Sequence, residues 1–321
     1  MSGGPRLPPV ARAIREGDRR ALAQLITRVE NGDEEVRPVL QALYPLTGHA
    51  RVIGFTGPLG VGKSSLINAL IAELRDRRLT VAVVAVDPSS PFTGGSVLGD
   101  RIRIDRPVSD TGLFFRSMAS RGHVGGVAVA TREVVRLLDA AGFDVILVET
   151  VGSGQVDVDS RDVASTSVVV LIPHLGDEVQ TLKAGLFEIA DVFCINKADL
   201  PGADSAARYL SELVALSPPR DGWAPVIVPT STTVPSGIPA LWGAIEAHEH
   251  HLDAEGRRAV AQRRRVAREL VDRIRDRVGR EIAQAMDDDP GWQRVLEEVV
   301  ARSLDPPSAA DQLLAGWRKR R

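Results

Sequence analysis

A glycine-rich segment with a lysine and a serine is the first part of this chain that could do chemistry. Gly57-Pro-Leu-Gly-Val-Gly-Lys-Ser-Ser65 follows the apolar run Val52–Phe55 and has the spacing Gly-x4-Gly-Lys-Ser. In loops of this pattern, backbone N–H groups surround a phosphate chain, and the following helix adds its positive N-terminal end. Lys63 would contact the β- and γ-phosphates, and Ser64 would supply a hydroxyl to Mg²⁺. The predicted nucleotide-binding residues of the loop are Gly57, Pro58, Leu59, Gly60, Val61, Gly62, Lys63, Ser64 and Ser65.

The lysine itself is informative because the chain hardly uses this residue type. Lysine and arginine together number 40, and only four of them are lysines. A compact ammonium fits an enclosed phosphate loop, whereas a planar, wider guanidinium fits it poorly. Lys63 and Lys197 both lie in segments with a nucleotide-binding pattern. We interpret both as positions where arginine is not an equivalent choice.

A second segment, Asn196-Lys-Ala-Asp199, predicts which base is bound. It directly follows the apolar run Val192–Ile195, so a parallel sheet would place it at the carboxyl edge, where ligands bind. Asp199 can accept hydrogen bonds from the N1–H and the amino group of guanine, and adenine offers neither donor there. Asn196 would bridge the base and the phosphate loop, while the stem of Lys197 would cover the ring. The segment therefore predicts GTP and GDP as ligands.

The end of the next predicted strand offers a cap for the base. Pro229-Thr-Ser-Thr232 follows the apolar run Val226–Val228. Ser231 and Thr232 would then lie where guanine-binding proteins contact the base through backbone N–H groups. A plain strand-end turn is the alternative interpretation of this segment.

Acidic residues at predicted strand ends are candidates for the metal site and the hydrolytic step. Glu149 ends an apolar run and Gly152 follows three residues later, which resembles the Asp-x-x-Gly switch that senses the γ-phosphate, with Glu for Asp. Asp87 and Asp100 are further candidates, with a helix cap or turn as the alternative for each. Ser153 rather than a glutamine follows Gly152, so we expect slow hydrolysis by the isolated chain. The predicted catalytic residues are Lys63, Asp100, Glu149 and Gly152, and the predicted Mg²⁺ ligands are Ser64, Asp87, Asp100 and Glu149.

These residues need a rigid scaffold, and the apolar pattern predicts an α/β fold. Short Val- and Ile-rich runs alternate with amphipathic helical segments, which is typical of a parallel sheet covered by helices on both faces. The predicted strands are Val52–Phe55, Val81–Val86, Val145–Val148, Val168–Ile172, Val192–Ile195 and Val226–Val228, and the helices between them include Lys63–Arg75, Val127–Ala140 and Leu175–Ile189.

Helical patterns flank the predicted sheet on both sides. Residues 9–44 predict two or three short helices, and residues 254–302 predict long, arginine-rich ones. We expect an N-terminal helical extension at 1–48, a nucleotide-binding domain at 49–253 and a C-terminal helical arm at 254–321.

Composition and charge exclude several classes of protein. The formal net charge is −2, which gives no support to nucleic-acid binding, and acids interleave the basic stretch Arg257–Arg280. That stretch is either a solvated helix face or a surface for an acidic partner. No apolar run is long enough to cross a bilayer and the N-terminal residues lack a signal core, so we expect a cytoplasmic protein without membrane contact. We interpret Cys194 as a buried strand residue, and His248-Glu-His-His251 as a solvated helix end rather than a metal site.

The combination of motifs closely resembles the MeaB/ArgK (methylmalonic aciduria type A) family of P-loop GTPases. The resemblance covers nearly the whole chain. The segments that carry it are Gly17–Leu22, Ala42–Gly48, Asp87–Ser90, Thr93–Asp100, Ser117–Gly126, Val148–Gln155, Asn196–Asp204 and Asp305–Leu314.

The resemblance implies a fold of the SIMIBI class and a chaperone of adenosylcobalamin-dependent acyl-CoA mutases, typically methylmalonyl-CoA mutase. It also implies a homodimer formed through the C-terminal helical arm, and a cobalamin adenosyltransferase as a further partner. GTP binding and hydrolysis would gate delivery of the cofactor and protect the mutase. A kinase of a transport system and a nickel metallochaperone are the alternatives. The segment Gly152-Ser-Gly-Gln-Val-Asp157 departs from the usual Gly-Val-Gly-Gln-Ser-Glu of the family, which bears on the choice of partner.

Overall fold

The chain forms two compact units. The computed structural model describes residues 7–87, 110–119, 126–150, 163–173 and 184–319. By their internal contacts, residues 1–261 form one unit and residues 262–321 the other. The expected limits of the helical extensions, at residues 48 and 253, stay predictions.

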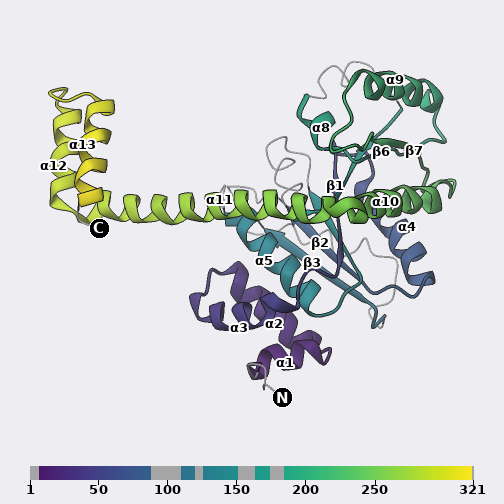
Figure 1. Ribbon diagram of the computed structural model, residues 1–321, viewed down its shortest axis with the longest axis horizontal. Coiled ribbons are helices and arrows are strands. Elements are labelled where there is room, and N and C mark those ends of the chain that lie inside the picture. Colours follow the sequence, from purple (N-terminus) through teal and green to yellow (C-terminus); the bar gives the residue numbers. More distant parts are fainter. Residues whose placement is uncertain (1–6, 88–109, 120–125, 151–162, 174–183, 320–321) are drawn as a thin grey trace. The chain divides into compact units, whose positions relative to one another are not determined.

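A seven-stranded parallel sheet forms the centre of the first unit (Figure 1). The strand order is β3-β2-β4-β1-β5-β6-β7, so β2, β3 and β4 lie on one side of β1 and the later strands on the other. Phe55 pairs with Glu149 and Val86 pairs with Thr150, so the central strands end together at one carboxyl edge. The strands are β1 (Arg51–Thr56), β2 (Val81–Asp87), β3 (Leu113–Ala119), β4 (Val145–Thr150), β5 (Thr166–Leu171), β6 (Val192–Ile195) and β7 (Val226–Pro229).

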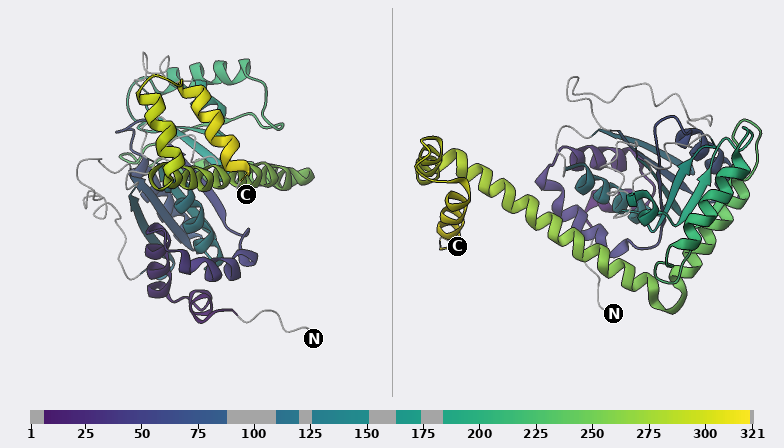
Figure 2. Two further views of the ribbon diagram at one scale, coloured as in Figure 1. Left: turned by 90° about the vertical axis from the view of Figure 1, so that its left-hand side faces the viewer. Right: turned by 90° about the horizontal axis from the view of Figure 1, so that it is seen from above.

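Helices cover both faces of the sheet (Figure 2). On one face, α4 (Lys63–Asp76) and α10 (Ile238–Asp253) pack against the strands. The other face has two groups of helices, one over β2 and β4 and one over β5 and β6. The first group consists of α1 (Pro9–Arg15), α2 (Arg19–Glu30), α3 (Arg37–Leu43) and α5 (Gly126–Ala140), and the second of α8 (Ala184–Ile189) and α9 (Ala203–Leu216).

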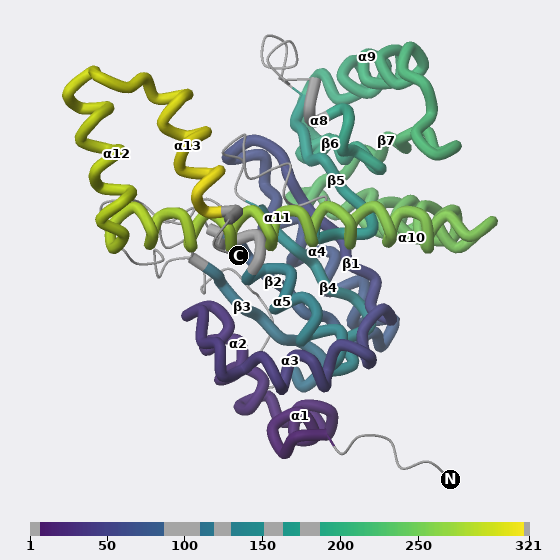
Figure 3. The backbone as a smooth tube through the Cα atoms, turned by 60° about the vertical axis from the view of Figure 1, so that its left-hand side comes forward, coloured from purple at the N-terminus to yellow at the C-terminus, as the bar shows by residue number. Residues whose placement is uncertain are grey.

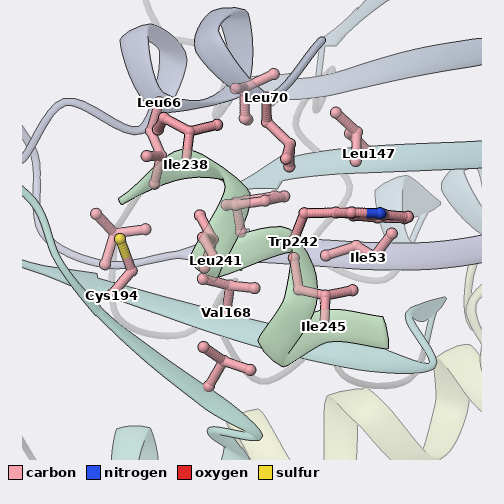
Figure 4. Packing of buried hydrophobic residues seen from close by; sticks show 14 of the residues in the cluster. Ile53, Leu66, Leu70, Leu147, Val168, Cys194, Ile238, Leu241, Trp242 and Ile245 are labelled. Carbon is pink, nitrogen blue, oxygen red and sulfur yellow. The ribbon is translucent and has the colours of Figure 1, made fainter. Parts of the chain in front are cut away.

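Successive strand residues point to opposite cores. Val168 and Val170 pack toward α4 and α10, whereas Val169 and Leu171 pack toward α8 and α9. Because both faces are covered, every residue of β5 is buried, and residues 168–171 form a continuous apolar run after the polar residues Thr166 and Ser167. Trp242 of α10, which has no exposed surface, lies in the first of these cores with the side chains shown in Figure 4.

The second unit is helical. It contains most of α11 (Arg257–Asp288), together with α12 (Pro290–Val300) and α13 (Pro306–Lys319). Asp289 caps α12 by accepting a hydrogen bond from the Gly291 N–H at 2.7 Å. α12 and α13 pack side by side (Figure 3).

The α/β prediction is confirmed, and each of the six predicted strands is present with its ends shifted by two residues or fewer. The prediction missed the edge strand β3. Its central residue, Arg116, interrupts the apolar run, and this side chain pairs with Glu30 of α2. The charged residue in this strand therefore has a partner that is close in space but distant in sequence, which the sequence does not indicate. Of the predicted helix Leu175–Ile189, the structure describes residues 184–189, which are helical.

Candidate functional site

The loop between β1 and α4 requires glycine at two positions. Gly57 has a φ of +140°, and a Cβ atom there would lie 2.2 Å from the carbonyl oxygen of Val170. Gly62 has a φ of +90°, and a Cβ atom there would lie 2.6 Å from Nδ2 of Asn196. Any other residue would be strained at both places. The glycines thus allow the loop to pass close to β5 and to the predicted base-binding segment.

Lys63 lies inside this loop, and its ammonium group donates hydrogen bonds to the loop backbone. The residue is only 6% exposed, and its Nζ donates to the carbonyl oxygens of Gly57 at 2.6 Å and Pro58 at 3.0 Å. A buried ammonium needs such partners to offset its loss of hydration. The loop therefore holds a positive charge at the N-terminal end of α4, where the helix dipole also favours an anion.

Two of the four predicted metal ligands are in contact. The Ser64 hydroxyl donates to Oε1 of Glu149 at 2.6 Å. Ser64 lies in the first turn of α4 and Glu149 lies in β4, whose pairing with β1 brings these two segments together. A hydroxyl and a carboxylate are hard oxygen ligands of the kind that Mg²⁺ prefers.

The predicted base-binding segment is tied directly to the phosphate loop. Asn196 is buried, and its Nδ2 donates to the carbonyl oxygen of Val61 at 2.8 Å. Lys197, which has a φ of +57°, donates from Nζ to the carbonyl oxygen of Gly60 at 2.9 Å. The two motifs are 135 residues apart in the Asn196–Val61 pair, and the parallel sheet brings them to one edge.

Asp199 is positioned by the loop that follows β7. The Ser231 hydroxyl donates to Oδ1 of Asp199, and the Val234 N–H in turn donates to the Ser231 hydroxyl at 3.1 Å. Backbone hydrogen bonds between Ser231 and Ser236 close this loop. Thr232 lies next to Ser231 in the same loop and is partly exposed.

The remaining predicted site residues are placed only in part. Asp87 is the last residue of β2, so its backbone lies at the same carboxyl edge as Thr150 of β4. Asp100 and Gly152 lie outside the described residues. Within the loop, Leu59 is 81% exposed and Ser65 is exposed at the start of α4.

Two residues at this edge were not predicted to contact the site. Thr230 is fully buried, and its hydroxyl donates to Oδ1 of Asn196 at 3.3 Å. The Thr230 hydroxyl also lies 3.1 Å from Sγ of Cys194. The sequence signal for Thr230 is its position directly beside Ser231 in the predicted base-capping segment. The prediction that Cys194 is a buried strand residue is confirmed, and burial raises the pKa of its thiol to about 12.

The interpretation of His248–His251 as a solvated helix end was wrong for its first two residues. His248 is 4% exposed and Glu249 is 1% exposed, at the amino edge of the sheet. His248 Nδ1 lies 2.9 Å from the hydroxyl of Thr166, the first residue of β5. The helix continues to Asp253, so these two residues face the sheet from inside α10 rather than from a frayed end.

Other classes of site find no support in the described part of the chain. Among residues 7–87, 110–119, 126–150, 163–173 and 184–319, no group of three or more His, Cys, Asp or Glu side chains could hold a metal ion. Within those same residues, no helix has the length and apolar character needed to cross a bilayer.

Comparison with known proteins agrees with this geometry. Residues 22–287 match the family model described as methylmalonyl Co-A mutase-associated GTPase MeaB. A protein of Pyrococcus abyssi that is named as an inferred GTPase is 46% identical over 94% of both chains. The GTPase ArgK of Escherichia coli is 34% identical over 94% of both chains.

Two further relatives extend the comparison. The mouse mitochondrial methylmalonic aciduria type A homolog is 30% identical over 95% of this chain and 78% of its own. A crystal structure described as LAO/AO transport system kinase superposes with a TM-score of 0.75, at 27% identity and with 99% of both chains covered. The extent of these matches, together with the phosphate loop and the guanine-type motif at one sheet edge, shows that the chain belongs to the MeaB family of P-loop GTPases.

Proposed function

We propose that this protein uses its GTPase cycle to gate the delivery of adenosylcobalamin to an acyl-CoA mutase and to protect that mutase. Methylmalonyl-CoA mutase is the expected client, because the description of the family names it. The observation that carries the proposal is the hydrogen bond between Asn196 and the phosphate loop, which would join the two motifs into one site for a guanine nucleotide. A change at the phosphate end of the nucleotide would therefore alter the position of both the phosphate loop and the Asn196 segment.

The phosphate end of the site would be served by residues of the loop and of β4. Lys63 would exchange the carbonyl oxygens of Gly57 and Pro58 for the β- and γ-phosphates. Ser64 and Glu149 fit Mg²⁺, since their oxygens already lie 2.6 Å apart. When bound, the metal ion neutralises charge that develops on the phosphate oxygens.

The remaining roles at the phosphate end stay part of the proposal. Asp87 and Asp100 would complete the set of metal ligands, and the Gly152 N–H would sense the γ-phosphate. Because Ser153 follows Gly152, the isolated chain has no glutamine at the position that commonly orients the attacking water. We therefore expect slow hydrolysis that a partner accelerates.

The base end of the site would select guanine. Asp199 accepts a hydrogen bond from Ser231, which orients the carboxylate. Its other lone pairs would accept the two guanine donors, and ATP would leave this carboxylate unpaired. Ser231 and Thr232 would cap the base, and the stem of Lys197 would lie over the ring.

The helical arm would join two copies of the chain. Leu270, Val271 and Ile274 of α11 are 55%, 46% and 61% exposed, and their spacing places them along one side of the helix. A second copy would cover this apolar strip while the arginines beside it remain in water. A cobalamin adenosyltransferase would be the second partner protein, as the source of the cofactor.

The proposal is tested by measuring GTP and ATP hydrolysis by the purified protein, alone and with each adenosylcobalamin-dependent mutase of its source organism. We expect GTP-selective turnover that rises with one mutase and not with the others. Light scattering on the same samples should give the mass of a dimer. GTP turnover that is indifferent to every mutase would contradict the chaperone role and leave the GTPase in place.

A phosphotransferase is the alternative that the same assay can expose. The superposed crystal structure is named as a transport system kinase. With GTP or ATP labelled on the γ-phosphate, a kinase would leave the label on an acceptor protein, whereas a GTPase releases inorganic phosphate. We expect release only.

A further inference from the structure

Asn196 is held by hydrogen bonds on both sides of its amide group. One side is the carbonyl oxygen of Val61 in the phosphate loop, 2.8 Å from Nδ2. The other is the hydroxyl of Thr230, 3.3 Å from Oδ1. Thr230 also contacts Cys194, whose Sγ lies 3.1 Å from the same hydroxyl. All of these groups except the loop carbonyl come from β6, β7 and the residues that directly follow them.

The direction of each hydrogen bond in the series from Val61 to Cys194 can be assigned by counting protons. A backbone carbonyl can only accept, so the Asn196 atom that faces Val61 must be the NH₂ group. Oδ1 then faces Thr230 and must accept, which uses the single hydroxyl proton of Thr230. The contact between Thr230 and Cys194 therefore needs its proton from the thiol.

Cys194 is suited to this donor role. It has no exposed surface and lies among the apolar side chains that also surround Trp242 (Figure 4). Burial raises the pKa of the thiol to about 12, so the sulfur keeps its proton at physiological pH. The strand positions are fixed as well, because Cys194 pairs with Val228 and the Thr230 N–H donates to the carbonyl oxygen of Ile195 at 2.8 Å.

We propose that Cys194 and Thr230 are positioning residues for nucleotide binding, which set the orientation of the Asn196 amide through a one-directional hydrogen-bond relay. The relay runs from the Cys194 thiol to the Thr230 hydroxyl, then to Asn196 Oδ1, and from Asn196 Nδ2 to the Val61 carbonyl. The inference rests on the proposed guanine site and adds residues that do not touch the nucleotide.

Loss of the relay would displace the phosphate loop. Without the Thr230 hydroxyl, Oδ1 of Asn196 loses its buried donor, and the amide is held only by the contact of Nδ2 with the phosphate loop. A Cβ at Gly62 would lie only 2.6 Å from Nδ2, so the loop and the amide are in close contact at this point. An amide that is held on one side only can tilt and thereby displace the loop that would surround the phosphates.

The test is the affinity of the purified full chain for GDP, measured with a fluorescent GDP analogue and competition by unlabelled GDP. Thr230→Val keeps the shape of the side chain and removes the hydroxyl, and we expect a dissociation constant about tenfold higher. Thr230→Ser keeps the donor and should restore affinity to within about twofold of the wild-type value. Cys194→Val should raise the dissociation constant about two- to threefold, because a thiol is a weak donor.

A matched control separates positioning from a general loss of stability. Thr166→Val removes another fully buried threonine hydroxyl, at the opposite edge of the same sheet. We expect this variant to melt at lower temperature and to bind GDP like the wild type. Wild-type affinity in Thr230→Val, or equal weakening in Thr166→Val and Thr230→Val, would overturn the relay.

A double-mutant cycle gives a second readout that stability alone would not move. Asn196→Ala should weaken GDP binding strongly, and adding Thr230→Val to it should cost almost nothing more, because the group that Thr230 orients is gone. Additive losses would contradict the inference. Neither result depends on a mutase, so a failure of the relay leaves the proposed chaperone function untouched, and the reverse also holds.

Discussion

The two edges of the sheet both bury polar side chains, but they arrange them differently. At the carboxyl edge, Lys63 and Lys197 donate to backbone carbonyl oxygens of the phosphate loop, and Asn196 does the same from its amide. At the amino edge, the cationic side chains pair with carboxylates instead. Glu249 accepts from the hydroxyl of Thr166 at 2.6 Å and also from Ser165 and Arg258.

We infer from this difference that the carboxyl edge is the one that binds a ligand. Carbonyl oxygens of a glycine-rich loop hold the cations of the carboxyl edge, and phosphate oxygens would be stronger partners for Lys63. At the amino edge the charges are already matched, since Arg258 faces Glu249 at 2.8 Å and Arg220 faces Asp191. We therefore expect changes at the carboxyl edge to alter nucleotide chemistry, and changes at the amino edge to alter stability.

The largest expected effect is that of Lys63→Met on GTP hydrolysis. The variant removes the ammonium group that would neutralise the phosphates, and we expect kcat/KM for GTP to fall by about 100- to 1,000-fold. Thermal unfolding of the nucleotide-free protein should change by only a few degrees. Steady-state phosphate release and a melting curve measure the two effects on one preparation.

Lys63→Arg is the matched control for charge. It keeps the positive charge but brings a planar guanidinium into a loop where the lysine is only 6% exposed. We expect it to remain at least about tenfold below the wild type. Wild-type activity in either variant would contradict the assignment of Lys63, and a large loss of stability without loss of activity would reverse the comparison of the two edges.

The second effect is that of Glu249→Gln on stability. The carboxylate is 1% exposed and pairs with Arg258 at 2.8 Å. Burial alone would raise the pKa of Glu249, but hydrogen bonds from Ser165, Thr166 and Arg258 outweigh burial and hold the pKa below its usual value. Glu249→Gln removes the buried charge that accepts these hydrogen bonds, while Arg258 keeps its pair with Asp253. We therefore expect the free energy of unfolding in urea to fall by about 2 kcal/mol.

Glu246→Gln is the matched control on the same helix. Glu246 pairs with Arg51 and Arg77, and its side chain is 31% exposed. A pair that is open to water contributes little, so this variant should lose less than about 1 kcal/mol. Both variants should keep the wild-type affinity for GDP. Equal losses of stability, or weaker GDP binding in Glu249→Gln, would contradict the division between the edges.

The two edges also differ in how far the sequence alone could predict them. The carboxyl edge was predictable because a nucleotide demands fixed residue types at fixed spacing, as in the segments around Lys63 and Asn196. The sheet was predictable because two covered faces make long parts of the strands continuously apolar, as in residues 168–171 of β5. These signals are local, and each can be recognised in a stretch of a few residues.

The amino edge was not predictable because its contacts join distant segments of ordinary composition. His248 and Thr166 are 82 residues apart, and nothing beside either residue indicates the other. The same reason explains the missed strand β3. Arg116 interrupts its apolar pattern, and the sequence does not indicate that Glu30 lies beside this arginine. The roles of Thr230 and Cys194 likewise depend on hydrogen bonds between strands rather than on a motif.

The smallest expected effect is a pH dependence that belongs to the amino edge alone. Burial lowers the pKa of His248, and this outweighs the opposite influence of Asp191 and Glu249, while Arg220 and His251 add to the lowering. The unfolded chain therefore takes up a proton near pH 6.5 before the folded chain does. Stability from this residue is complete above that pH and is lost as the pH falls below it, at no more than about 1.4 kcal/mol per pH unit.

Urea unfolding at pH 7.5 and pH 5.5 measures this effect, with His248→Gln as the variant that cannot titrate. We expect the wild type to lose more stability than His248→Gln between the two pH values, because all other titrating groups are shared. The ratio of GDP affinities of the two proteins should be the same at both pH values, since the histidine is remote from the phosphate loop along β5. A larger loss in His248→Gln would mean that the protonated histidine is stabilised by Asp191 more than burial opposes it. A pH-dependent affinity ratio would instead show that protonation at the amino edge is energetically coupled to nucleotide binding. The two edges would then share no direct contacts but would still affect each other's free energies.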